Sequence, residues 1–228
     1  MEVKKIAVIG AGTMGNGIAQ VFAHRGYPVV MIDIKDSFVE RGIAAIEKSL
    51  SRLVKKEAIS EAAKTEVLGR IKGSTNLKDA SSADLVVEAV LEDFAMKTKV
   101  FKELDGLLGK DAILSTNTSS ISITALGAQT SRPDRFIGMH FMNPVPVMRL
   151  VEIIRGLATS DETTAAIVDL SRKYPGFSLK TYDRSSAPDW RKAFVTNVAD
   201  VEALNPNRTL RVTLDASLQS TAQTTPKI

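Results

Sequence analysis

One of the chain's two histidines has a setting suited to proton transfer. His140 ends the apolar run 136–139, and Glu152 lies in the next apolar run, beyond a proline-rich turn. Neighbouring strands can bring such side chains together. A carboxylate bonded to an imidazole fixes its tautomer and raises its basicity, which suits removal of a hydroxyl proton. A core histidine beside an unrelated surface glutamate fits the spacing equally well, so both interpretations stay open at this point.

The second chemical feature is a G-x-G-x-x-G sequence at residues 10–15. The apolar run 5–9 precedes it, and a helix-like stretch, residues 16–24, follows. A second apolar run, 29–32, then ends in Asp33. This order of strand, glycine turn, helix, strand and acid is typical of a dinucleotide-binding βαβ unit.

Each glycine of the turn has an expected task. Gly10 permits the tight turn, and Gly12 leaves room for a pyrophosphate at the start of the helix. Gly15 lets the helix pack closely against the strand. We therefore expect a dinucleotide site at this turn.

Weaker patterns lie elsewhere. Residues 117–120 (Asn-Thr-Ser-Ser) follow a predicted strand end, where a hydroxyl could bond a substrate oxygen or simply cap a helix. Ser49 and Lys56 are seven residues apart and share one face of a predicted helix, which is either a phosphate contact or a solvated basic face. His24 is expected to be structural or exposed.

Composition narrows the function classes. The 228 residues are 44% hydrophobic and 25% charged, as in ordinary globular proteins, and the net charge is +4. With no cysteine there is no thiolate chemistry or disulfide, and we assign no metal site. Scattered basic residues and few aromatics argue against nucleic-acid binding. No apolar run is long enough for a bilayer and no signal peptide is evident, so the expected location is cytoplasmic.

The remaining pattern predicts an α/β fold with a doubly wound, mostly parallel sheet. A helical hairpin spans residues 37–70, with Ser60 as the N-cap of its second helix. Further strands are expected at 72–76, 83–90, 112–117, 135–142 and 150–154. Helices are expected at 94–108, from Ser120 or Ser122 to 126, and at 162–173 with Asp161 as the cap.

Residues 182–228 have a different composition. They are rich in serine and threonine and lack sustained helical periodicity, although 210–214 is a candidate strand. We expect a dinucleotide-binding domain at 1–181 and an irregular or disordered segment at 182–228.

Three stretches together carry a family resemblance: the glycine turn at 10–15, the sequence at 117–120, and the string at 140–152 that begins His-Phe-Met-Asn-Pro-Val-Pro-Val-Met. Over about residues 4–170 the chain resembles the L-3-hydroxyacyl-CoA dehydrogenase family, and most closely its bacterial members that act on 3-hydroxybutyryl-CoA. The resemblance favours a functional pairing of His140 with Glu152. It also implies a Rossmann-type sheet with a helical-hairpin insertion.

The resemblance implies specific roles. His140 is the general base toward the 3-hydroxyl and Glu152 orients it, while Ser119 bonds the substrate oxygen. Asp33 binds the adenosine ribose of NAD. The other residues implied in binding are Glu92, Lys97 and Asn143 for NAD, and Ser49 and Lys56 for coenzyme A.

The expected activity is hydride transfer between NAD and C3 of a short-chain 3-hydroxyacyl-CoA. The family's all-helical C-terminal domain, which forms its dimer interface and closes the acyl pocket, has no counterpart that aligns after about residue 173. We therefore expect that domain to be absent or replaced and the dimer interface to be lost. The alternative function is an NAD-binding fragment with little or no turnover.

Overall fold

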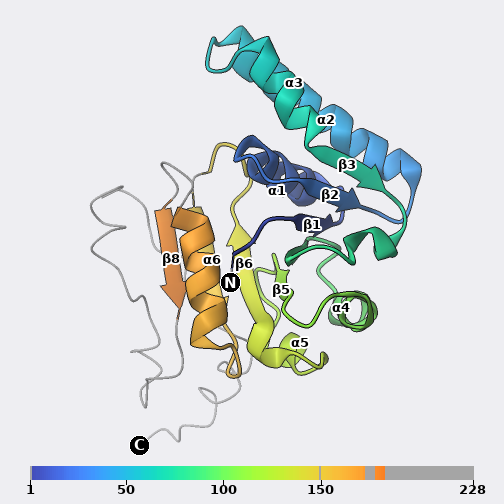
Figure 1. The fold of residues 1–228 in the computed structure, drawn as a ribbon, viewed down its shortest axis with the longest axis vertical. Helices are drawn as coiled ribbons and strands as arrows, with labels where there is room; N and C mark the ends of the chain where they lie inside the picture. Colours follow the sequence, from blue (N-terminus) through green and yellow to red (C-terminus); the bar gives the residue numbers. More distant parts are fainter. Residues whose placement is uncertain (1, 149, 173–177, 183–228) are drawn as a thin grey trace, which may run out of the picture.

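The computed structural model describes residues 2–148, 150–172 and 178–182. These residues form an eight-stranded sheet in the order β3-β2-β1-β4-β5-β6-β7-β8 (Figure 1). All neighbouring strands run parallel except β6 and β7, which are antiparallel. The strands are β1 (Ile6–Ile9), β2 (Val29–Ile32), β3 (Ile71–Ser74), β4 (Leu85–Glu88), β5 (Ile113–Thr116), β6 (Phe136–Phe141), β7 (Leu150–Arg155) and β8 (Ser178–Tyr182).

Helices pack on both faces of this sheet, as the doubly wound prediction requires. Alternate residues of β1 point to opposite faces, so that Ile6 and Val8 belong to one apolar cluster and Ala7 and Ile9 to the other. The first cluster takes side chains from α1 (Thr13–His24), α2 (Asp36–Lys55), α3 (Glu61–Gly69) and α6 (Asp161–Arg172). The second takes them from α4 (Phe94–Leu107) and α5 (Ile123–Gly127).

Two predicted helix starts need correction. Helix α1 begins at Thr13 rather than at residue 16, because Gly12 is already the N-cap. Asp161 is the first residue of α6 and not its cap, since Ser160 Oγ accepts the Thr163 N–H at 3.1 Å. Ser160 is the N-cap instead, because its short side chain can accept the N–H three residues further along the chain.

Other predicted elements fall where expected, with small shifts. Ser60 caps α3 by accepting the Ala63 N–H, as predicted. Of the two candidate serines, Ser122 caps α5. Strand β3 covers residues 71–74 rather than 72–76, because Asn76 instead caps the short 3₁₀ helix η1 (Leu77–Ala80).

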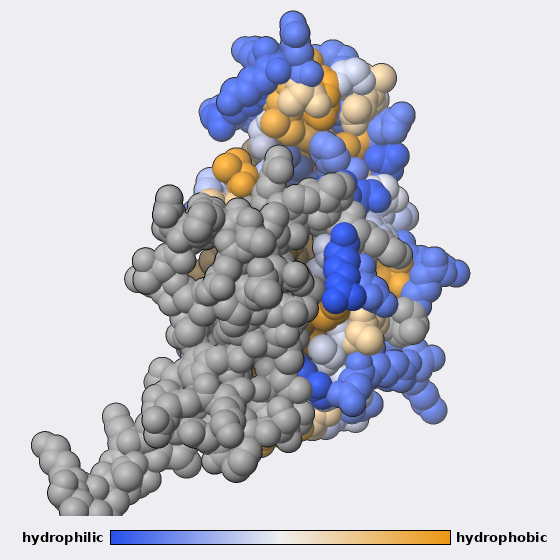
Figure 2. All heavy atoms as spheres, turned by 90° about the vertical axis from the view of Figure 1, so that its left-hand side faces the viewer, coloured by the Kyte–Doolittle hydropathy of each residue, from blue (hydrophilic) through white to orange (hydrophobic). Residues whose placement is uncertain are grey.

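The helical hairpin α2–α3 projects from the body of the domain (Figure 1). It is anchored by buried side chains of α2, including Ile46 and Leu50, which belong to the cluster around α1. Figure 2 shows apolar residues gathered at this end of the molecule, bordered by hydrophilic ones.

Strand β8 was not expected from the sequence. It pairs in parallel with β7, with Val151 opposite Leu179. The candidate strand at 210–214 and the rest of 183–228 lie outside the described residues, and the division at 181/182 remains a prediction. Among the residues described, no helix is long and apolar enough to cross a bilayer.

Candidate active site

Two cavities lie next to each other at the carboxyl ends of the central strands. One, of about 350 Å³, is lined by residues of the glycine turn together with Asp33, Phe38 and Arg41. The other, of about 320 Å³, is lined by residues that follow β4, β5 and β6. Open α/β sheets bind ligands at the carboxyl edge, at the strand where the order of the strands reverses. Here that strand is β1, which lies between β2 and β4. The second cavity contains five of the predicted site residues: Glu92, Lys97, Ser119, His140 and Asn143.

The backbone of the glycine turn explains two of its glycines. Gly10 has φ +103°, and a Cβ there would lie 2.6 Å from the Ala89 carbonyl oxygen. A Cβ at Gly15 would lie 1.8 Å from the Gly10 carbonyl oxygen. The close contact with the Gly10 carbonyl, within the turn, is therefore the main reason why position 15 must be glycine. Val8 Cγ1, on β1, lies 3.6 Å from the same point, so the expected close approach of the helix to the strand adds to this requirement.

Gly12 and Asp33 prepare the first cavity for an anionic dinucleotide. Gly12 is the N-cap of α1 without a side-chain cap, and nothing lies within 4 Å of the place a Cβ would take. The start of α1 therefore borders the cavity, and the N–H groups of a first helical turn can bind a pyrophosphate there. Asp33 accepts the Ala11 N–H and the Ile34 N–H, each at 2.7 Å, which fixes its carboxylate at the end of β2. These residues fit an NAD pyrophosphate and ribose.

His140 and Glu152 form the pair that the sequence suggested. They are direct partners in the antiparallel register of β6 and β7, and His140 Nδ1 lies 2.8 Å from Glu152 Oε2. Glu152 is buried and His140 lines the second cavity. Donation of the Nδ1 proton to Glu152 leaves the lone pair on Nε2, where a base is needed.

Asn117 holds this strand end in place. Its Oδ1 accepts the Phe141 N–H at 2.8 Å, across the gap between β5 and β6. The sequence pointed to residues 117–120 for a hydroxyl, and this positioning bond by the amide was not foreseen. Asn117 also lines the second cavity.

The Ser119 loop is held by Glu92. Glu92 Oε1 accepts the Ser119 N–H and the Ser120 hydroxyl, both at 3.1 Å, and also the Thr118 hydroxyl. Burial by itself would raise the pKa of Glu92, but the Thr118 hydroxyl and the charge of Lys97 outweigh it and lower the pKa. Glu92 is therefore a carboxylate acceptor at neutral pH.

Lys97 lies in the cavity wall with its ammonium group already engaged. It is 1% exposed, is 2.7 Å from Glu88 Oε1, and is 3.3 Å from Glu92 Oε2. A contact with a cofactor would use its remaining N–H. Glu88, fully buried at the end of β4, was missed from the sequence, although a charged residue within the apolar run 85–90 was the available signal.

Ser49 and Lys56 are not brought to either cavity. Ser49 is half-buried on α2, and Lys56 is the exposed C-cap of that helix. Both belong to the projecting hairpin. Any contact they make with coenzyme A would therefore involve a part of that ligand which extends beyond the two cavities.

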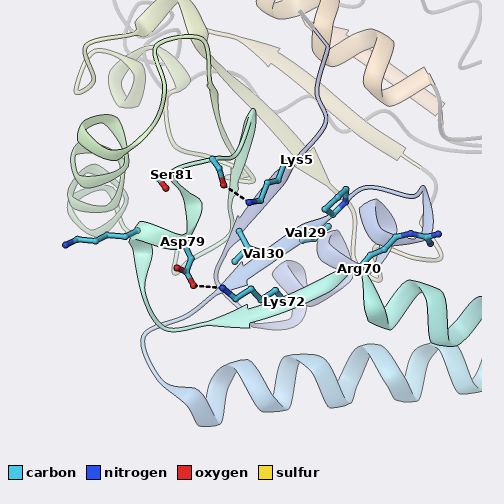
Figure 3. A pocket seen from close by; sticks show the side chains of 10 residues that line it. Lys5, Val29, Val30, Arg70, Lys72, Asp79 and Ser81 are labelled. Atoms are coloured by element: carbon cyan, nitrogen blue, oxygen red, sulfur yellow. Dashed lines mark hydrogen bonds and ion pairs between the residues drawn. The ribbon is translucent and has the colours of Figure 1, made fainter.

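A further cavity, of about 300 Å³, lies at the opposite, amino-terminal edge of β1, β2 and β3 (Figure 3). Several of its charged groups are paired locally. Lys72 Nζ is 3.2 Å from Asp79 Oδ2, and Lys5 Nζ donates to Ser82 Oγ. Arg70, at its rim, is bonded to Glu66. This cavity contains none of the residues that the sequence assigned to a site.

The doubly wound sheet, the glycine turn and the histidine–glutamate pair define an NAD-binding dehydrogenase domain. A family model described as "3-hydroxyacyl-CoA dehydrogenase, NAD binding domain" matches residues 5–177. The chain belongs to this family. The match extends slightly beyond the range of about 4–170 expected from the sequence.

Individual relatives agree. The chain is 49% identical over 211 residues to the probable 3-hydroxybutyryl-CoA dehydrogenase of Deinococcus radiodurans, covering 88% of this chain and 76% of that protein. It is 44% identical to the 3-hydroxybutyryl-CoA dehydrogenase of Bradyrhizobium diazoefficiens, covering 89% and 73%. The crystal structure of the (S)-3-hydroxybutyryl-CoA dehydrogenase from Ralstonia eutropha matches with a TM-score of 0.77 and 53% identity. That match covers 79% of this chain and 64% of that one.

Proposed function

We propose that the chain interconverts a short-chain 3-hydroxyacyl-CoA and the corresponding 3-ketoacyl-CoA with NAD as the cofactor. The observation that carries the proposal is the His140 Nδ1–Glu152 Oε2 contact of 2.8 Å in the wall of a cavity that adjoins the glycine turn. The named activity of the relatives, 3-hydroxybutyryl-CoA dehydrogenase, supports the substrate class.

His140 removes the proton of the 3-hydroxyl at Nε2, while Glu152 keeps its tautomer and stabilises the imidazolium that results. NAD, when bound, supplies the hydride acceptor for C3. Ser119 bonds the substrate oxygen from the other wall of the same cavity. In the reverse direction His140 returns the proton to the ketone oxygen.

The remaining site residues bind the two ligands. Gly12 and Asp33 hold the pyrophosphate and the adenosine ribose, and Glu92, Lys97 and Asn143 line the cavity near the reacting end. Ser49 and Lys56 contact the coenzyme A portion along the helical hairpin. No role in binding nucleic acid or a membrane is proposed.

Purified protein tests this proposal directly. Loss of NADH absorbance with acetoacetyl-CoA as substrate is expected, together with NADH binding in a separate fluorescence titration. Binding without turnover would replace the proposal with the alternative, a domain that binds NAD only. Failure to bind NADH would contradict both functions.

A further inference from the structure

Three charged side chains form a continuous chain from the sheet to the Ser119 loop. Glu88, at the end of β4, is 0% exposed, and Lys97, on α4, is 1% exposed. Their charged groups are 2.7 Å apart. Lys97 is also 3.3 Å from Glu92 Oε2, and Glu92 is 40% exposed. Charge alternates along this array, and its outer end reaches the cavity.

Hydrogen-bond donors surround Glu88. Its Oε1 accepts the Val90 N–H and the Lys97 ammonium, groups that can only donate. Its Oε2 lies 2.6 Å from the Thr116 hydroxyl oxygen, which itself accepts the Thr118 N–H at 3.3 Å. The Thr116 hydroxyl is a further donor to Glu88. Burial raises the pKa of Glu88, and the charge of Lys97 and these donors oppose that effect.

At the outer end of the array, the two oxygens of Glu92 bind different partners. Oε2 faces Lys97, and Oε1 binds three successive residues of the loop, among them the Ser119 N–H. A single carboxylate therefore joins the buried ammonium to the loop. Without an acceptor at position 88, the buried ammonium would depend on Glu92 for its hydrogen bonding and would draw that carboxylate away from the loop.

We propose that Glu88 is a positioning residue which, through Lys97 and Glu92, holds the Ser119 loop in its working geometry. This inference rests on the proposed function for its effect on catalysis. Its effect on the loop itself can be measured without turnover. A displacement of about 1 Å at a reacting group can cost roughly 10²-fold in rate.

The experiment compares E88A and E88Q with a matched control, D105N. Gln at position 88 keeps an acceptor for Val90 and Lys97 and can donate to Thr116, so it should preserve the network. Asp105 forms another ion pair, with Arg132 at 2.6 Å, that lines neither of the two site cavities. The readouts are hydrogen exchange of residues 117–121 and, where turnover is present, kcat/KM for acetoacetyl-CoA.

We expect E88A to increase exchange at 117–121 selectively and to lower kcat/KM by about 10²-fold. E88Q should lose less than about tenfold, and D105N should leave the exchange of this loop and kcat/KM unchanged. A uniform rise in exchange across the chain, or equal losses in E88A and E88Q, would overturn the proposal. If E88A does not fold, K97M cuts the same array, and wild-type exchange of the loop in K97M would overturn it.

A double-mutant cycle tests whether Glu88 acts through Glu92. In an E92A background the loop has already lost its acceptor, so adding E88A should have little further effect on exchange at 117–121. Additive effects would overturn the mechanism. If the wild-type protein shows no turnover, the proposed function fails, and the exchange measurements still decide the role of Glu88.

Discussion

The two edges of the sheet use charge differently. At the carboxyl edge, ionic groups form arrays that join separate loops, as Glu92 does with Ser119 and Ser120, which lie 27 and 28 positions away. At the amino edge, charged side chains form separate pairs, such as Lys72 with Asp79 (Figure 3) and Arg132 with Asp105. The carboxyl-edge groups hold predicted site residues around two cavities, whereas the amino-edge cavity contains none of the predicted site residues.

Helix polarity accounts for part of this difference. The N-terminus of α1 lies at the carboxyl edge, where the N–H groups of a first helical turn, which lack partners within the helix, favour an anion. At the amino edge the last carbonyls of α4 need donors instead. Arg132 donates to the carbonyl of Asp105 in the last turn and to that of Gly109 just beyond the helix, while its Nε donates to the Asp105 carboxylate. The same helix orientation therefore favours a ligand site at the carboxyl edge and a structural ion pair, Arg132 with Asp105, at the amino edge.

The largest effect should come from the base. H140Q is expected to lower turnover by about 10²- to 10⁴-fold, the usual contribution of general base catalysis, while NADH affinity stays near that of wild type. Steady-state kinetics and a fluorescence titration measure the two quantities.

The control for H140Q lies at the other edge. K72M removes a charge from the amino-edge cavity and should leave turnover unchanged. E152Q should lose less than H140Q, because the imidazole remains. If H140Q kept the wild-type rate, or K72M shared its loss, the division between the edges would be wrong.

Cofactor choice should show the next largest effect. Asp33 favours NAD because its carboxylate accepts ribose hydroxyls and repels a 2′-phosphate. We expect NADH to bind at least about tenfold more tightly than NADPH, as a charged hydrogen bond is worth roughly 1.5–3 kcal/mol. D33N should reduce the preference for NADH over NADPH, because it removes the repelling carboxylate and leaves Arg41, which borders the same cavity, to attract the 2′-phosphate. Tighter binding of NADPH to the wild-type protein would contradict the prediction.

A smaller effect is expected on the helical hairpin, away from both edges. K56E should raise the KM for acetoacetyl-CoA severalfold and leave that for NADH unchanged, because charge reversal weakens a phosphate contact without altering the chemistry. K48E places the same charge change on another face of α2 and serves as the control. Equal effects of K48E and K56E would indicate only a general loss of positive charge.

Much of the carboxyl edge was predictable from local patterns. The glycine turn and Asp33 follow from spacing. For His140 and Glu152, two apolar runs joined by a short turn left two interpretations open, and the family resemblance favoured the pair. The array of Glu88 was visible only as a charge inside an apolar run. Its partner Lys97 is nine positions away on a helix, so no periodic pattern connects them.

The amino edge was harder to predict. Arg132 and Asp105 are 27 positions apart, and both are residue types that usually lie exposed. Only the packing of α4 against the segment before β6 brings them together. Strand β8 was missed because its sequence, Ser-Leu-Lys-Thr-Tyr, has a single aliphatic side chain to mark it.

The smallest effect on activity, and a distinct effect on stability, should come from D105N. Burial alone would raise the pKa of Asp105, but the Ser131 N–H and the Arg132 guanidinium outweigh it and lower the pKa. Because the folded pKa lies below the unfolded value of about 3.9, the carboxylate stabilises the fold above that pH. This contribution is lost as the pH falls through the folded pKa.

D105N should therefore be about 1–3 kcal/mol less stable than wild type at pH 7, since Arg132 and Ser131 lose a charged acceptor. The difference should begin to shrink below about pH 4, where Asp105 of the unfolded chain becomes protonated, and should be lost as the pH falls through the lower pKa of the folded protein. Urea unfolding at several pH values measures the gap, and turnover per folded molecule should not change. A gap that is constant with pH would contradict the role of the Asp105 charge, and lost turnover would show that the amino edge also shapes the site.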